Sequence, residues 1–222
     1  LYNSFTDEVS ILDPKIKILY DENTPKEVEY KHYDFFTFLI EKGFYVPDDE
    51  NESDKCITSW EEQDNDPSTY TITINPTLNC NMHCWYCYEN RVKGSKISTN
   101  IVEGIKKHIE VSYNLSPYKK LNLSFFGGEP FLNFNAIKEI LSSVKIFCKA
   151  KEINLNVDFT TNGSLITQAE LQFLSEFNCT FQITLDGNKE QHNKVKYSKN
   201  KYFDAYTSTL NNIKQIQSKI NQ

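Results

Sequence analysis

YTITINPTLNCNMHCWYC, residues 70–87, carries the two features of this sequence that decide its fold and its chemistry. In its first part, Tyr70–Asn75, Ile72 and Ile74 alternate with threonines, which is the period-two pattern of a half-buried β-strand. Its second part, Cys80–Cys87, is a polar loop with three cysteines in eight residues. A strand that runs directly into a reactive loop is typical of the carboxyl edge of a parallel sheet, where α/β proteins place their sites.

From residue 70 onward, segments with strand and helix periodicity alternate along the chain. Strands are predicted at residues 70–75, 121–126, 153–160 and 180–185, and helices at 100–114, 135–149, 167–177 and 203–220. Thr167 and Glu170 form a capping box at the start of the third helix, and Asn100 and Glu103 form a weaker one at the start of the first. Strand–helix alternation at this spacing predicts βαβ units, and therefore an α/β fold with a parallel sheet of about four strands.

The strands themselves alternate, although a parallel sheet covered by helices on both faces has continuous apolar runs. In the third strand Leu155, Val157 and Phe159 are apolar, whereas the residues between them are polar. Helices can therefore cover one face while the polar face meets water or a ligand. A sheet curled into a partial barrel, with helices outside and a wet lumen, satisfies both conditions and places its sites at the carboxyl ends of the strands. The alternative is a two-layer sheet with one solvated face.

Composition and charge exclude several classes of protein. The chain has 222 residues, 39% of them hydrophobic, so it can bury a full core. A net charge of −6 argues against a general nucleic-acid binder, and no apolar run reaches the roughly 18 residues of a membrane span. Residues 1–69 are acidic and are predicted to form a small α+β region, with a helix at 30–43, a short strand at 44–46, a charged stretch at 48–54 and a loop at 61–68.

Cys80, Cys84 and Cys87 crowd together, whereas the cysteines at positions 56, 148 and 179 stand alone and are predicted to serve packing, as is the tryptophan at position 60. Three thiolates on one loop can hold three irons of a cubane cluster and leave the fourth iron open, whereas electron-transfer clusters use four cysteines. The alternative is a zinc site in which His83 or Cys56 completes the ligand set. Structural zinc usually draws ligand pairs from two segments, and the sequence offers no second pair, which favours the cluster.

The other three strand ends carry short motifs of small and polar residues. Gly-Gly-Glu-Pro at 127–130 follows the second strand, Thr-Asn-Gly at 161–163 the third and Leu-Asp-Gly at 185–187 the fourth. The two adjacent glycines let a ligand approach bare backbone, and their carbonyl groups can accept hydrogen bonds from an ammonium group, for which Glu129 adds a negative charge. Each motif alone is also an ordinary turn. Their position beside the cysteines at one edge of the sheet indicates a shared site.

In this order, Cys-x3-Cys-x2-Cys, Gly-Gly-Glu-Pro, Thr-Asn-Gly and Leu-Asp-Gly resemble the radical S-adenosylmethionine (SAM) superfamily over residues 70–220, and more narrowly its peptide maturases with a C-terminal SPASM domain. The resemblance implies a partial (β/α) radical SAM barrel and a 5′-deoxyadenosyl radical that abstracts a substrate hydrogen. It implies a [4Fe-4S] cluster on Cys80, Cys84 and Cys87, with SAM on the open iron. The SAM-binding positions that it implies are Tyr86 near the adenine, Gly127, Gly128 and Glu129 at the methionyl amine, and Thr161, Asn162, Thr184 and Asp186 nearby. Lys196 stands where the family often has arginine, which keeps the charge but loses the bidentate fork.

The resemblance also implies partners and a setting. It predicts a cytoplasmic, oxygen-sensitive enzyme that modifies a ribosomally synthesised precursor peptide and takes electrons from flavodoxin or ferredoxin. Residues 1–69 resemble the winged-helix-like region with which such maturases bind a precursor leader, or serve packing alone. The core at 70–222 is expected to continue beyond residue 222, because four parallel strands close no barrel. The alternatives are another SPASM-type enzyme, such as an anaerobic sulfatase maturase, and a non-catalytic metal-binding module. The sequence assigns neither a catalytic base nor the bond that is modified.

Overall fold

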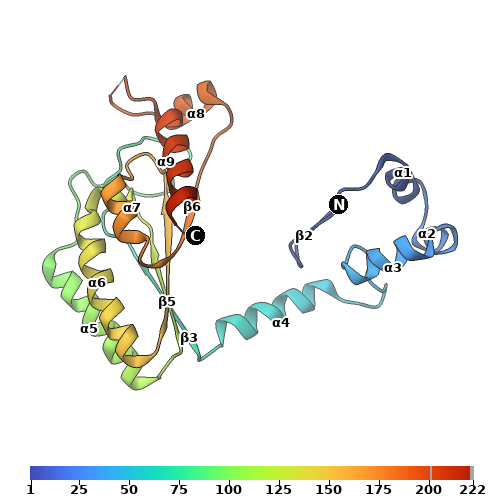
Figure 1. Ribbon diagram of the computed structural model, residues 1–222, viewed down its shortest axis with the longest axis horizontal. Helices are drawn as coiled ribbons and strands as arrows, with labels where there is room; N and C mark the ends of the chain where they lie inside the picture. Colours follow the sequence, from blue (N-terminus) through green and yellow to red (C-terminus); the bar gives the residue numbers. More distant parts are fainter. Residues whose placement is uncertain (201, 221–222) are drawn as a thin grey trace. The chain divides into compact units, whose positions relative to one another are not determined.

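The four predicted strands form one parallel sheet in the computed structural model of the chain, which describes residues 1–200 and 202–220 (Figure 1). The sheet order is β3–β4–β5–β6, and neighbouring strands pair in parallel. The strands are β3 (Thr69–Ile74), β4 (Lys120–Phe125), β5 (Asn154–Thr161) and β6 (Asn178–Ile183). The predicted α/β class and all four strands are therefore confirmed, with ends that differ by one or two residues.

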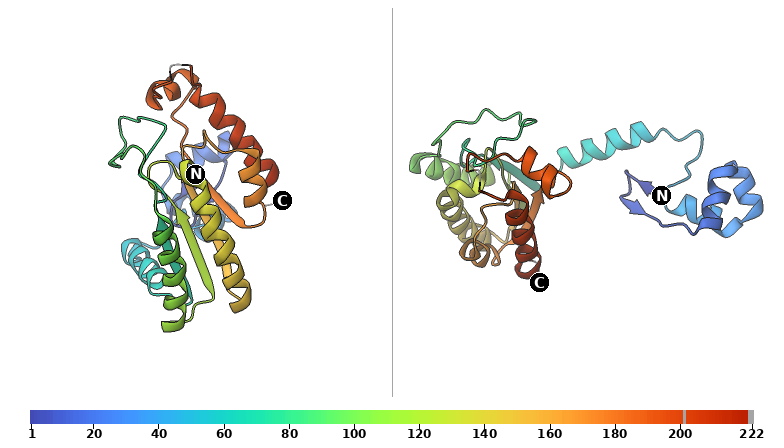
Figure 2. Two further views of the ribbon diagram at one scale, coloured as in Figure 1. Left: turned by 90° about the vertical axis from the view of Figure 1, so that its left-hand side faces the viewer. Right: turned by 90° about the horizontal axis from the view of Figure 1, so that it is seen from above.

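Helices connect the four strands and follow the last one, and most of them pack on the apolar face of the sheet. They are α5 (Thr99–Leu115), the 3-10 helix η1 (Pro130–Asn133), α6 (Phe134–Lys151), α7 (Gln168–Leu174), α8 (Lys189–Val195) and α9 (Ala205–Lys219). Figures 1 and 2 show α5 and α6 along the same side of the sheet. Leu121, Leu123, Phe125, Val157 and Phe159, at alternate strand positions, are buried beneath the helices in one hydrophobic core. This burial contributes most of the stability of the unit because it removes large apolar side chains from water.

The ends of these helices follow the predictions in part. The capping box of Thr167 and Glu170 begins α7, as predicted. The predicted box at Asn100 is wrong, because Ser98 caps α5 two residues earlier. α9 confirms the helix predicted at 203–220. α8 escaped prediction because its seven residues are too short to show a clear helical period.

The opposite face of the sheet is polar, as the alternation predicted. A row of hydrogen bonds crosses it, from Asn122 Nδ2 to Thr71 Oγ1 (3.2 Å), from Asn156 Nδ2 to Asn122 Oδ1 (3.0 Å) and from Asn178 Nδ2 to Asn156 Oδ1 (2.8 Å). The strand register places these four residues opposite one another on β3 to β6. Cross-strand pairs of this kind stabilise a sheet face.

Residues Leu1–Asp66 form one compact unit and Pro67–Gln222, with the parallel sheet, form another. The first unit contains a hairpin and four helices, which are β1 (Tyr2–Asn3), β2 (Glu8–Val9), α1 (Pro14–Glu22), α2 (Pro25–Lys31), α3 (Tyr33–Glu41) and α4 (Glu52–Asp64). Its small core centres on Val28, Phe35 and Leu39. Among the described residues, no helix has the length and apolar character that crossing a membrane requires.

Local capping gives two segments of the first unit bounds that differ from the prediction. The helix predicted at 30–43 is confirmed over Tyr33–Glu41 as α3, but it begins only after His32, which has a non-helical backbone (φ −156°, ψ 78°) and caps α3 with its ring. The charged stretch at 48–54 and the loop at 61–68 lie partly in α4. Asn51 begins this helix, because its side-chain oxygen accepts two backbone N–H groups of the first turn.

The strand predicted at 44–46 is also wrong, because the chain there completes the end of a helix. Phe44 N and Tyr45 N both donate to Leu39 O, at 2.8 and 3.0 Å. Gly43 has a φ of +70°, the left-handed conformation that commonly ends a helix. The apolar residues after Gly43 therefore fold back on α3 and pair with no strand.

Candidate cluster and cofactor site

Two loops lie against each other at the carboxyl edge of the sheet. The cysteine loop (residues 75–97) follows β3, and the Gly-Gly-Glu-Pro loop (residues 127–130) follows β4. Gly128 N and Glu129 N donate to backbone carbonyl groups of the cysteine loop, at 3.0 and 2.8 Å. A Cβ atom on Gly128 would clash with the backbone oxygen of Asn79. The cysteine loop therefore requires a glycine at this position for its own packing.

Glu129 joins the Gly-Gly-Glu-Pro loop to the loop that follows β5. Its side chain is completely buried. Its Oε1 accepts hydrogen bonds from Thr161 Oγ1 (2.7 Å) and Phe131 N (3.2 Å), and its Oε2 accepts one from Asn162 N (2.9 Å). Burial raises the pKa of Glu129, and the three hydrogen bonds act in the opposite direction. The carboxyl group thus fixes two loops, while its contact with a cofactor amine stays a prediction.

Asn162 extends this network to the cysteine loop. Its Nδ2 donates to Asn81 Oδ1 (2.9 Å) and lies 3.9 Å from Cys80 Sγ, within reach of a sulfur acceptor. Met82 N donates to the same sulfur at 3.4 Å. Burial raises the pKa of the Cys80 thiol, and the bond from Met82 acts against that shift. These N–H groups favour a thiolate at Cys80, the form in which cysteine binds a metal.

Helix α9 holds the loop after β5 from its other side. Thr209 Oγ1 donates to Asn162 O (3.0 Å), and Asn212 Nδ2 donates to Gly163 O (2.8 Å). Both polar side chains are buried, which is stable because each satisfies a backbone carbonyl group. Sequence reasoning missed both residues. Their spacing of three along one helix was the available signal, since it places them on one face.

A second polar group surrounds Asp186, which follows β6. Tyr86 Oη donates to its two carboxylate oxygens at 3.2 and 3.1 Å, and Lys196 Nζ lies 3.6 Å from Oδ2. Lys196 is only 5% exposed. Burial acts to lower the pKa of Lys196, but a hydrogen bond with Tyr86 and the negative charges of Cys84 and Asp186 outweigh it, and the pKa is raised. A buried cation therefore acts on Cys84, where it opposes the rise in thiol pKa that burial causes.

The six cysteines of the chain are thiols that form no disulfide with one another. Cys80 and Cys84 are half-buried and Cys87 is exposed, with Cys87 N donating to Cys84 O at 3.3 Å. Cys148 and Cys179 lie in the core of the second unit, as predicted. Burial raises the pKa of Cys148 to about 11 and that of Cys179 to about 12, so neither is a reactive thiol.

The surroundings of the cysteine loop suit thiolate ligands of a cluster. Within residues 1–200 and 202–220, no three His, Cys, Asp or Glu side chains converge closely enough to hold one metal ion. A cubane cluster needs no such convergence on one ion, because each cysteine binds a different iron and the three sulfurs surround the cluster. The N–H donors at Cys80 and the cation that acts on Cys84 suit such thiolate ligands.

The structure connects most of the predicted site residues. Hydrogen bonds join them in two groups, the first with Glu129, Thr161, Asn162 and Cys80 and the second with Tyr86 and Asp186. Thr184 lies exposed directly after β6. Trp60 was expected to pack locally, and that prediction is wrong, since it is 65% exposed on α4.

Comparisons with known proteins show which family and which relatives the chain resembles. The model of the radical SAM superfamily matches residues 74–221. Radical SAM cyclopropyl synthase TigE of Paramaledivibacter caminithermalis is 28% identical over 204 residues, which cover 83% of this chain and 40% of that protein. A cysteine-type anaerobic sulfatase-maturating enzyme of Clostridium novyi is 29% identical over 153 residues, which cover 65% of this chain and 39% of that protein. The chain thus spans about two fifths of the length of these relatives.

Solved structures support the same fold. The structure of anSMEcpe with bound AdoMet superimposes with a TM-score of 0.58 at 23% identity, covering 68% of this chain and 41% of that one. The structure of anSMEcpe with bound AdoMet and the Cp18Cys peptide also has a TM-score of 0.58, at 22% identity. At this identity the likeness concerns the fold alone. It favours the partial radical SAM barrel over a two-layer sheet.

Proposed function

Because the chain belongs to the radical SAM superfamily, we propose that it acts as a radical SAM enzyme that modifies a ribosomally synthesised precursor peptide. The observation that carries this proposal is the meeting of three loops at the carboxyl edge of the sheet. Glu129 and Asn162 link the cysteine loop, the Gly-Gly-Glu-Pro loop and the loop after β5 by hydrogen bonds. The cofactors of the superfamily are a [4Fe-4S] cluster and SAM.

In this proposal Cys80, Cys84 and Cys87 ligate the cluster. The N–H groups of Met82 and Asn162 aim at the sulfur of Cys80, and hydrogen bonds to ligating sulfurs adjust the reduction potential of a cluster. Three ligands leave one iron open for SAM. When bound, the cluster and SAM supply the reductive cleavage that forms a 5′-deoxyadenosyl radical.

The SAM-binding residues are proposed from the same edge of the sheet. They are Tyr86 for the adenine, Gly127, Gly128 and Glu129 for the methionyl amine, and Thr161, Asn162, Thr184 and Asp186 around them. The hydrogen bonds of Glu129 and Asn162 support this assignment indirectly, because they hold the loops in one arrangement. Prior ordering of a site reduces the entropy that binding has to offset.

A peptide substrate is supported by the relatives and by the first unit. One similar structure holds a peptide, Cp18Cys, together with AdoMet. We assign residues 1–69 to recognition of the precursor and residues 70–222 to cofactor binding. The free cysteines suit a reducing compartment, so we place the protein in the cytoplasm, with a flavodoxin or ferredoxin as electron donor.

An anaerobic sulfatase maturase is the second candidate. The similarity to the enzyme of Clostridium novyi, 29% identity over 153 residues, favours it. The two candidates differ in substrate. The peptide maturase would be favoured if a small precursor gene lies beside the gene for this chain. The product of that gene should change mass when it is incubated with the reduced protein and SAM. Modification of a sulfatase peptide in place of the precursor would favour the second.

The metal content of anaerobically prepared protein tests the central claim. Wild-type protein is expected to bind about four irons and four sulfides per chain, since three thiolates hold one cubane. Cys84→Ala should abolish this binding. Cys148→Ala is the matched control, because Cys148 lies in the core and should leave the iron content unchanged. Stoichiometric zinc without iron in the wild type, or a full cluster in Cys84→Ala, would refute the proposal.

A further inference from the structure

The first unit carries most of the acidic charge of the chain. Residues 1–66 hold 18 of the 30 Asp and Glu residues but only 6 of the 24 Lys and Arg residues, which gives a formal charge of −12. The remainder of the chain has a formal charge of +6. A unit with this charge attracts basic ligands and repels acidic ones.

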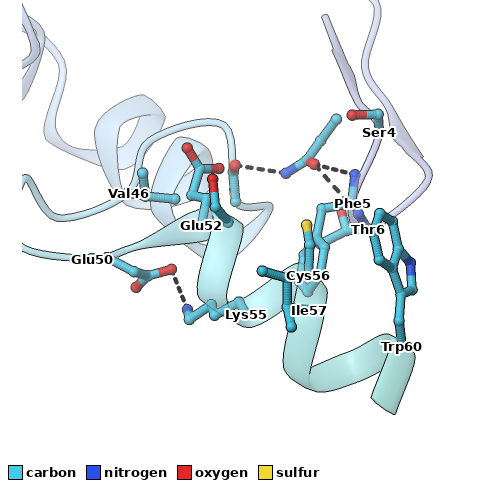
Figure 3. Close-up of a pocket in the computed structure, with 13 residues that line it drawn as sticks. Ser4, Phe5, Thr6, Val46, Glu50, Glu52, Lys55, Cys56, Ile57 and Trp60 are labelled. Atoms are coloured by element: carbon cyan, nitrogen blue, oxygen red, sulfur yellow. Dashed lines mark hydrogen bonds and ion pairs between the residues drawn. The ribbon is translucent and has the colours of Figure 1, made fainter. Parts of the chain in front are cut away.

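A pocket of about 570 Å³ opens in this unit (Figure 3). Its walls come from the β1–β2 turn, from the segment that follows α3 and from the first turns of α4. Asn3 fixes the first two walls together, because its Nδ2 donates to Gly43 O (2.6 Å) and its Oδ1 accepts from Phe5 N (2.9 Å). The pocket therefore has a built wall before any ligand binds.

The apolar side chains of the pocket remain exposed. Trp60 is 65% exposed, Phe5 51% and Ile57 48%. Ile57 and Trp60 lie three residues apart and so share one face of α4, with Cys56 beside them (Figure 3). Exposed apolar patches with a polar rim mark interaction sites, because they keep large side chains in contact with water until a partner covers them.

An acidic surface continues from this pocket along α4. A neighbouring pocket of about 440 Å³ shares Phe5, Glu50 and Lys55 with the first and adds Asp54 and Glu62. Lys55 forms an ion pair with Glu50, so its charge is already neutralised. A ligand that fills the apolar pocket thus meets net negative charge beside it.

We propose that this pocket binds a segment of the peptide substrate in which apolar residues alternate with lysine or arginine, outside the residue that is modified. The inference rests on the proposed function, since it assumes a peptide substrate. Apolar side chains of the segment would cover Phe5, Ile57 and Trp60, and its basic side chains would face Asp54 and Glu62. An extended chain suits this division, because its successive side chains point in opposite directions.

Fluorescence anisotropy with the full chain and short labelled peptides tests the proposal. The probes are a peptide of alternating leucine and lysine, one of glycine and lysine, and one of leucine and glutamate. The Leu-Lys peptide should bind tightest, because it alone satisfies both the apolar and the acidic surface. Trp60→Ala should weaken its binding by about tenfold, as loss of a central aromatic anchor does, and Trp60→Phe should restore most of it. Tyr30→Ala should have no effect, since Tyr30 is an exposed aromatic residue of the same unit that lines neither pocket.

Equal binding by Trp60→Ala and Tyr30→Ala would overturn the proposal, and so would equal binding of the Leu-Glu and Leu-Lys peptides. Sedimentation of the peptide-free chain tests a second occupant. A dimer of the wild type that becomes a monomer in Trp60→Ala would show that a second copy covers the pocket, and this result would also overturn the proposal. The iron content of the same Trp60→Ala protein should match that of the wild type, which would show that the cluster-binding unit is unaffected by the substitution. Failure of cluster binding in the wild type would refute the proposed function while leaving the peptide result intact.

Discussion

Replacement of Glu129 by glutamine tests whether this residue holds the loops of the site together. The carboxyl group is completely buried and accepts hydrogen bonds from Thr161, Asn162 and Phe131. Glutamine has nearly the same shape but only one acceptor oxygen. If that oxygen takes the place of Oε1, which accepts two of the bonds, the amide nitrogen faces Asn162 N–H, donor against donor.

The cost follows from these contacts. Loss of the hydrogen bond to Oε2 leaves the part-buried Asn162 N–H group without an acceptor, which costs about 1–3 kcal/mol. Removal of a buried carboxyl group offsets part of this. Glu129→Gln is therefore expected to lower the free energy of unfolding of the second unit by about 2 kcal/mol at pH 5, within the range of ordinary core changes.

The pH dependence has a definite sign. Burial raises the pKa of Glu129 in the folded protein above the value of 4.5 that it has when unfolded. Between these two values unfolding releases a proton, so the contribution of Glu129 to stability is full below pH 4.5 and falls as the pH rises through the folded pKa. Glutamine does not titrate. The stability difference between wild type and Glu129→Gln should therefore be smaller at pH 8 than at pH 5.

Hydrogen exchange of the β4 and β5 amides, measured against urea, reports unfolding of this unit alone. Glu110→Gln is the matched control, because Glu110 is exposed on α5 and the same chemical change there should cost little. The reasoning is refuted if Glu129→Gln is as stable as Glu110→Gln, or if its deficit grows between pH 5 and pH 8.

Two further predictions concern single contacts. Gly128→Ala should displace the cysteine loop and lower iron binding after anaerobic reconstitution, because the new Cβ meets Asn79 O. Gly104→Ala is the control, since Gly104 faces open space on α5. This variant should retain iron and gain about 0.5–1 kcal/mol of stability. Tyr118→Phe should lose about 1 kcal/mol, since Tyr118 Oη donates to Ile109 O. Burial raises the pKa of Tyr118 to about 12, so the stability of the wild type should fall between pH 10 and pH 12. Urea midpoints would measure this decline, and Tyr118→Phe should lack the part of it that Tyr118 causes.

The parallel sheet could be predicted because its signals are local and repeated. Apolar residues at alternate positions of each strand, such as Val157 and Phe159, are enough to indicate both the strand and its covered face. The first unit also carries local signals in its sequence. Thr24 and Glu27 form a capping box with Pro25 at the first helical position, which marks the start of α2. The break at His32 has no such mark, since the apolar pattern continues through it.

The site could be predicted only as far as its motifs reach. The three cysteines and the strand-end motifs are visible in sequence because each is a short run at a strand end. The bond between Asn162 and Asn81 joins residues 81 positions apart, and those from Thr209 and Asn212 come from a helix whose polar residues look solvated. Burial of these side chains depends on how the loops pack, which a single sequence does not express.

The motif residues therefore serve two purposes that one substitution does not separate. Gly128 is required by the backbone of the cysteine loop, and Glu129 by the donors of the loop after β5. A variant at either position that loses SAM binding shows only that the three loops have moved. Thr161→Val is more informative, because it removes one donor to Glu129 and keeps the side-chain shape. Loss of stability with unchanged SAM affinity in that variant would assign Thr161 to positioning, and the reverse would assign it to the cofactor.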